Sequence, residues 1–168
     1  MNVVNKKYSR ILLAISLLVM LVGCARQQEE EKAYREVLIS AGEVITKMAS
    51  ACISHARSYI SIREYARITG EDFDAIVDKI LGSDYQEVLA QLKANKMKID
   101  EFMEGLEEPP SALAGLYGKL FELHALYSKI HALAVSPSGS IEEYSVSIND
   151  LESQMNDLKS GMDLLYEQ

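Results

Sequence analysis

Apolar residues recur at steps of three and four along most of this chain, which is the spacing of one face of an α-helix. The first such stretch runs from Tyr34 to Gly70, and the serine-rich segment 49–61 inside it leaves open whether one helix covers the whole length. A short helix is predicted from about Asp72 to Gly82, whose glycine suits a helix end. The pattern therefore predicts that the chain is helical from about Tyr34 onward.

Two further helices are predicted before a Ser136–Ser140 loop. The first runs from Ser83, which with Gln86 has capping-box spacing, to the prolines at 109–110, and the second runs from about Pro110 to Val135. The second is the most apolar, so we expect it at the centre of the packing. Its small residues should let another helix approach closely: Gly115, Gly118, Ala125 and Ala132.

The last helix carries the most regular pattern in the chain. Ser140 with Glu143 gives it a capping-box start. Its apolar residues alternate steps of three and four, as in a coiled coil, and either pack inside their own bundle or pair two copies of the chain. Short connections between amphipathic helices predict an all-α fold, an antiparallel four- to five-helix bundle. The heptad positions are Ile141, Tyr144, Ile148, Leu151, Met155, Leu158, Met162 and Leu165.

Composition narrows the class of protein. The 168 residues are 48% apolar and carry a formal charge of -8, which excludes a disordered chain and argues against a nucleic-acid-binding surface. Only two cysteines are present, too few for a disulfide scaffold.

The N-terminus differs from the rest of the chain. Residues 1–10 contain Lys6, Lys7 and Arg10 and no acid, and 11–23 contain no charge. A basic segment followed by an apolar run of 13 residues is typical of a secretory signal peptide. The run is shorter than the roughly 20 residues that a membrane-spanning helix needs.

This segment ends in Leu21-Val22-Gly23-Cys24, which closely resembles the lipobox of bacterial lipoprotein precursors. The resemblance implies that signal peptidase II cuts before Cys24 and that this cysteine carries the lipid, such as palmitate, that anchors the protein. With Ala25 next to it, the resemblance implies an outer-membrane location facing the periplasm in a Gram-negative organism. No other cofactor is expected.

Cleavage would divide the chain into three parts: a signal peptide over 1–23, a lipidated N-terminus and polar tether over 24–32, and a helical bundle over 33–168. The mature chain would hold 145 residues with 14 basic and 25 acidic side chains, a charge of -11. Such an acidic domain should not lie flat on anionic lipid. We therefore expect the lipid to hold the protein at the membrane while the bundle faces water.

Cys52 and His55 lie three residues apart on one predicted helix face, the spacing that a thiolate–imidazole pair needs. No third group or oxyanion loop accompanies them, and a lone cysteine on an apolar helix face is commonly a core residue. The alternatives are a core thiol, a mixed disulfide with a partner and a catalytic pair.

The other two histidines, His124 and His131, share a face about 10.5 Å apart along the axis, too far for both to chelate one zinc ion. With His55 they could line a haem or metal pocket, although no Cys-x-x-Cys-His or Glu-x-x-His motif occurs. The competing interpretation is that they are partly buried, hydrogen-bonded side chains.

Acidic residues crowd the predicted end of the third helix, and Glu104, Glu107 and Glu108 are candidates for docking a basic partner. No hydrolase, metalloprotease, phosphate-loop or dinucleotide motif is present, so we expect no catalysis. The sequence favours a lipid-anchored helical module that binds an envelope protein as an adaptor, assembly factor or inhibitor. The alternatives are a carrier of an apolar ligand or haem and a helical enzyme with a diffuse site.

Overall fold

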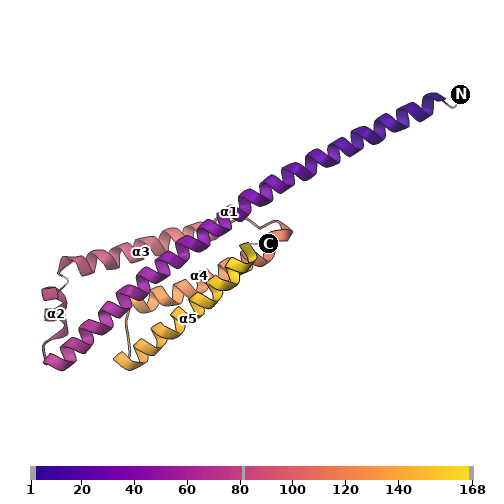
Figure 1. Cartoon of the computed structure of the whole chain (residues 1–168). Coiled ribbons are helices and arrows are strands. Elements are labelled where there is room, and N and C mark those ends of the chain that lie inside the picture. Colours follow the sequence, from indigo (N-terminus) through magenta and orange to yellow (C-terminus); the bar gives the residue numbers. More distant parts are fainter. Residues whose placement is uncertain (1–2, 81, 167–168) are drawn as a thin grey trace.

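The computed structural model describes the backbone of residues 3–80 and 82–166 and the side chains of residues 27–79, 82 and 84–166. Every regular element in the described residues is helical (Figure 1), which confirms the all-α prediction. The elements are α1 (Val3–Thr69), α2 (Phe73–Ile80), α3 (Ser83–Glu104), the 3-10 turn η1 (Ser111–Leu113), α4 (Ala114–Val135) and α5 (Ile141–Tyr166).

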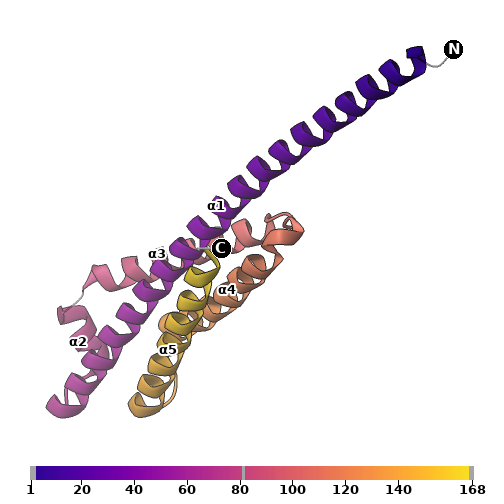
Figure 2. The same ribbon diagram turned by 45° about the vertical axis from the view of Figure 1, so that its right-hand side comes forward.

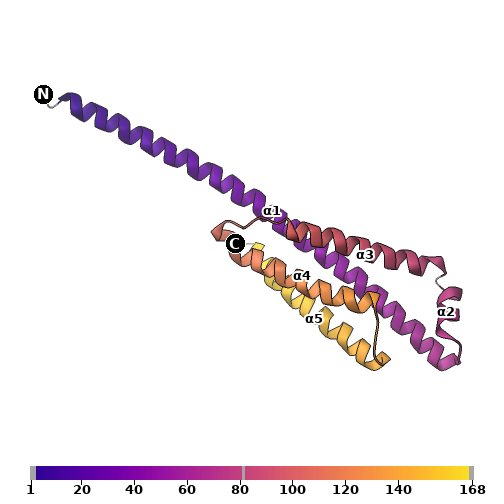
Figure 3. The ribbon, with the colours of Figure 1, turned by 180° about the vertical axis from the view of Figure 1, so that it is seen from behind.

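Four of these helices form an antiparallel bundle in which successive long helices reverse direction (Figures 1 and 3). The first and third long helices, α1 and α4, run the same way and pack closely along the diagonal of the bundle. The other two, α3 and α5, lie on opposite sides of this pair, and each contacts both α1 and α4 (Figure 2). The short α2 closes one end of the bundle against α1.

The first helix is continuous through the serine-rich segment. The hydroxyls of Ser50, Ser58 and Ser61 each donate to the carbonyl oxygen four residues earlier, at 3.0 to 3.1 Å, so these polar side chains are satisfied within the helix itself. The N-terminal part of α1 extends well beyond the bundle (Figures 1 and 2). Cys24 lies in this part, outside the residues whose side chains are described.

Within the described side chains, the Gln27–Thr69 part of α1 is long and apolar enough to cross a membrane. The core helix of a water-soluble bundle can be equally long and apolar, and so can a signal sequence. Leu38, Ile45 and Cys52 are at most 1% exposed and pack into the bundle. Burial in the core therefore accounts for part of this apolar character.

The main core fills the space between α1, α4 and α5 and extends to α3. A smaller cluster of Ile62, Ile76 and Val77 joins α2 to the end of α1. The α5 heptad residues face inward, so they pack inside their own bundle, as one of the two alternatives predicted. The largest fully buried side chains are Tyr127, Leu38, Ile45, Ile76, Leu120, Leu123, Ile130, Ile148 and Met162.

The capping predictions have different outcomes. At the start of α5, Glu143 N donates to Ser140 Oγ and Ser140 N donates to Glu143 Oε2, both at 3.1 Å, which confirms that capping box. At the start of α3 the prediction is wrong, because the cap position is held by Gly82 and Ser83 is already helical.

The end of the third helix also differs from the prediction. The helix ends at Glu104 with Gly105 as its cap residue, so Glu107 and Glu108 lie in the following loop. The prolines at 109–110 therefore come five residues after the last helical residue and do not themselves end the helix.

The small residues of α4 do not make the expected close helix contact. Gly115 and Gly118 are exposed, and a Cβ added to either would meet nothing within 4 Å. The close approach lies instead at Gly42 of α1, where an added Cβ would lie 2.8 Å from Tyr166 Oη. The expectation failed because α4 buries the large side chains of its opposite face, Leu120 and Leu123 among them.

Candidate functional site

Cys52 and His55 both point into the protein from α1. Cys52 is fully buried, and burial raises the pKa of its thiol to about 11. The His55 ring stacks on Tyr85 of α3 with 5.0 Å between centroids, and burial lowers the pKa of His55. Both groups are therefore neutral near pH 7, which does not suit a thiolate–imidazolium pair. This environment suits a core thiol.

His124 links two helices. Its Nε2 lies 2.7 Å from Oδ1 of Asp100 on α3, and the ammonium group of Lys96 lies 2.6 Å from the same oxygen. Burial acts to raise the pKa of Asp100, but hydrogen bonds and charges from Lys96 and His124 hold that pKa below its usual value. This geometry makes His124 part of the α3–α4 contact.

His131 is partly buried beside the core residue Tyr127, with 6.0 Å between ring centroids. Burial and the charge of Lys96 lower the pKa of His131, although a hydrogen bond with the backbone of Leu92 acts in the opposite direction. Within the described residues, three buried side-chain polar atoms lack a hydrogen-bond partner: His55 Nε2, Tyr127 Oη and His131 Nε2.

The three histidines are not gathered around one point. Each has a different aromatic or carboxylate neighbour, namely Tyr85, Asp100 or Tyr127. Among the side chains that the structure describes, no group of three or more His, Cys, Asp or Glu residues is placed to hold a metal ion. The metal pocket considered from the sequence, lined by all three histidines, is therefore not assembled in this part of the chain.

The glutamates at the end of α3 lie beside the first bundled turns of α1. The phenol of Tyr34 on α1 donates a hydrogen bond to the backbone carbonyl of Glu107, which fixes the 105–110 loop against α1. Together, residues 27–44 and 98–108 contain ten acidic and three basic side chains. We call these two segments the acidic end; they include the predicted docking residues Glu104, Glu107 and Glu108.

Sequence reasoning missed a second stripe on α1, which lies beside the buried core stripe. It follows steps of four and three for 36 residues, and every member is exposed. All four large apolar side chains of α1 that are exposed in the described residues fall on it: Val37 at 42%, Val44 at 51%, Tyr65 at 46% and Ile68 at 79%. We call this stripe the outer α1 face; it consists of Ala33, Val37, Ser40, Val44, Lys47, Ala51, Ser54, Ser58, Ser61, Tyr65 and Ile68.

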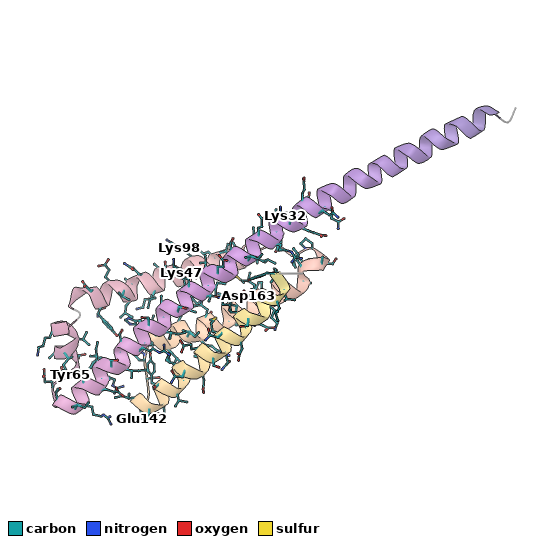
Figure 4. All side chains as sticks on the ribbon, viewed as in Figure 1. Lys32, Lys47, Tyr65, Lys98, Glu142 and Asp163 are labelled. Carbon is teal, nitrogen blue, oxygen red and sulfur yellow. The ribbon has the colours of Figure 1, made fainter. Side chains whose placement is uncertain are left out.

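The outer α1 face and α3 together border a groove of about 560 Å³. Val37 and Val44 line one wall, while Ile99 and Phe102 line the other, with Lys98 at the rim. Figure 4 shows the side chains around these helices and labels Lys47 on α1 and Lys98 on α3. This groove is mainly apolar and starts within the acidic end.

A second hollow of about 330 Å³ follows along the same two helices. Ala51, Ser54 and Ser58 of the outer α1 face line it from α1, and Tyr85 and Val88 line it from α3. Residues 33 to 58 span about 37 Å at the rise of an α-helix. The two hollows thus lie in line along α1, and small side chains predominate on the α1 wall of the second. The 4-3 spacing of small residues was the sequence signal for this surface, but the larger core stripe beside it concealed that signal.

Comparisons with protein-family models, with curated proteins and with solved structures give no significant match to this chain.

Proposed function

We propose that this protein is a lipid-anchored envelope protein whose helical bundle binds another protein. The outer α1 face is the observation that carries the proposal. A face that repeats every three and four residues and exposes Val37, Val44, Tyr65 and Ile68 has the pattern by which helices pair. The core of the bundle is complete without it, so the stability of the fold does not account for these side chains.

The anchor is supported by the sequence at the start of the chain. A basic segment, an uncharged run and Leu21-Val22-Gly23-Cys24 follow in the order of a lipoprotein precursor. The outer α1 face begins at Ala33, nine residues after Cys24, a helical distance of about 14 Å. An anchored bundle would therefore present this face close to the membrane, on the periplasmic side of the outer membrane if the organism is Gram-negative.

Binding without catalysis fits the chemistry of the candidate residues. The Cys52 thiol is buried and stays protonated, and His124 is engaged with Asp100. The exposed polar residues of the outer α1 face are hydroxyls and one lysine, and Ser50, Ser58 and Ser61 on this side of α1 already bond to the helix backbone. An adaptor, an assembly factor and an inhibitor all require only such a contact surface.

Crosslinking in intact cells tests this function. The tagged full-length chain is treated with a membrane-permeable amine-reactive crosslinker, and adducts are separated by mass and identified. We expect one or a few discrete adducts with another envelope protein, and we expect their yield to fall when Cys24→Ser removes the anchor. If the crosslinked protein remains monomeric while a known envelope complex in the same cells is captured, the proposal is wrong.

A further inference from the structure

We infer that the groove between the outer α1 face and α3 receives an amphipathic helix of the partner protein, and that this helix carries basic side chains against the acidic end. The inference rests on the proposed function and names the chemistry of the partner. It follows from the shape of the groove, from the spacing of its walls and from the charge around it.

The walls suit a helix. The apolar residues at the groove mouth lie on two antiparallel helices, and Val37 and Val44 are one heptad apart. Phe102 on α3 is 41% exposed, so its ring is available at the opposite wall. A helix placed here would bury these side chains and would form a further bundle layer with α1 and α3.

The second hollow, which follows the groove along α1 and α3, sets a requirement on the size of the partner's side chains. Ala51, Ser54 and Ser58 leave little side-chain volume between α1 and an incoming helix. Facing helices pack well when large side chains oppose small ones, with axes about 8–10 Å apart. The partner helix should therefore place bulky apolar residues opposite these three positions.

Charge distinguishes a partner from a second copy. Two copies anchored in one membrane by Cys24 would pair their α1 helices in parallel, which would bring Glu36 near Glu36, Glu43 near Glu43 and Lys47 near Lys47. Like charges brought together in this way oppose pairing. Lysine or arginine side chains of a different protein would instead complement the acidic end.

The same charges oppose a lipid surface as the occupant. The acidic end holds ten acidic and three basic side chains, and the cytoplasmic and envelope lipids that proteins meet are commonly anionic. An apolar groove that starts within the acidic end and has Glu36 in its lining therefore favours a basic amphipathic segment of a protein.

Site-specific photo-crosslinking in the full-length chain, made in its native cells, tests this inference. A photoreactive phenylalanine analogue is placed singly at Val44 or at Phe102, on the two groove walls. Val146 of α5 is the matched control, since it is a 59% exposed valine outside the groove. We expect one adduct of the same mass from both groove positions, in at least fivefold higher yield than from Val146.

Sequencing of the crosslinked peptide then tests the chemistry of the occupant. We expect a segment with apolar residues at steps of three and four and with lysine or arginine at one end. The double variant Glu101→Lys/Glu104→Lys should reduce the adduct at Val44 at least fivefold, whereas Asp150→Lys/Asp157→Lys on α5 should leave it unchanged. Unaltered helical circular dichroism of each variant shows that the bundle is intact.

Three results would overturn the inference: a groove adduct with a second copy of the chain or with lipid, a captured segment without the helical apolar pattern, and an adduct that is insensitive to the acidic-end variant. Adducts from Val146 alone would contradict the groove but leave protein binding standing. No protein adduct from any of the three positions would contradict both the groove and the proposed function.

Discussion

Asp100 on α3 lies 2.7 Å from Nε2 of His124 on α4, and the same carboxylate is 2.6 Å from the ammonium group of Lys96. These contacts join α3, which forms one wall of the groove, to the centre of the bundle. Because the side chains are partly exposed, solvent weakens the interaction. The contact still fixes α3 relative to α4.

Replacing this carboxylate should loosen α3. We expect Asp100→Ala to lower the free energy of unfolding by about 1 kcal/mol, since it removes the hydrogen bonds that the carboxylate makes with Lys96 and His124. Urea unfolding followed by circular dichroism measures the change. Asp150→Ala, at an exposed position on α5, serves as the control and should shift stability by less than about 0.5 kcal/mol. Equal effects of the two variants would show that the contact is not stabilising.

Two buried tyrosines provide a matched pair. The Tyr144 hydroxyl donates to the carbonyl oxygen of Leu133 at 3.0 Å, whereas the Tyr127 hydroxyl is buried without a partner in the described residues. We expect Tyr144→Phe to cost about 1 kcal/mol, and Tyr127→Phe to be neutral or to stabilise by up to about 1 kcal/mol. Thermal unfolding of both variants measures which of them is more stable. A larger loss from Tyr127→Phe than from Tyr144→Phe would contradict this assignment of the two hydroxyls.

The glycines of the bundle should also respond differently. Gly118→Ala places a methyl group in open space on α4, so it should raise the free energy of unfolding by about 0.5–1 kcal/mol. Gly42→Ala gains the same helix propensity but brings Cβ to 2.8 Å from Tyr166 Oη and 3.0 Å from Met162 Cε. These side chains must then move, so the gain should be smaller or reversed. Identical gains in chemical denaturation would contradict the close contact of α5 with α1.

Stability should fall on both sides of a plateau from about pH 7 to pH 8.5. Unfolded histidine binds a proton near pH 6.5, whereas burial lowers the pKa of His55 and His131, so acid favours the unfolded state. The unfolded thiol ionises near pH 8.5–9, whereas that of Cys52 ionises near 11, so alkali above about pH 9 also favours unfolding.

His55→Phe isolates the acid side of this profile. Phenylalanine keeps a ring against Tyr85 and removes the buried Nε2 that lacks a partner. We expect the variant to be more stable than the wild type below pH 6.5, with a difference that grows as the pH falls toward 5. Urea midpoints measured from pH 5 to pH 8 check this, and a difference that shrinks on acidification would contradict the assignment.

The helices and their order could be predicted from the sequence because long amphipathic patterns dominate the chain. The α5 pattern from Ile141 to Leu165 predicted the helix and its apolar face, but not whether that face packs inside the bundle or pairs two copies of the chain. The end of α3 was harder to predict. Pro109 and Pro110 are strong signals for a helix end, but the helix already ends at Glu104 with Gly105 as its cap residue. The continuity of α1 could not be predicted from composition, because serine is common in loops, whereas the hydroxyls of Ser50, Ser58 and Ser61 bond to the backbone within the helix.

The faces of the helices were less predictable than the helices themselves. In α1 the pattern from Tyr34 to Gly70 predicts one apolar face, but Val37 and Val44 are exposed while Leu38 and Ile45 are buried. The sequence alone does not show which apolar positions of a broad stripe are buried. That depends on which side of α1 packs against α4 in the bundle. Contacts such as Asp100 with His124 join residues of different helices, so spacing along one helix could not predict them.

Metabolic labelling with a palmitate analogue tests most directly whether the chain is held at a membrane, on which the orientation of the groove and its partner depends. The full-length protein, Cys24→Ser and Cys52→Ala are compared, since these two cysteines are the only ones in the sequence. The account predicts strong labelling of the wild type and of Cys52→Ala, and an unlabelled, uncut precursor for Cys24→Ser. Full labelling of Cys24→Ser, or labelling that depends on Cys52 instead, would contradict it.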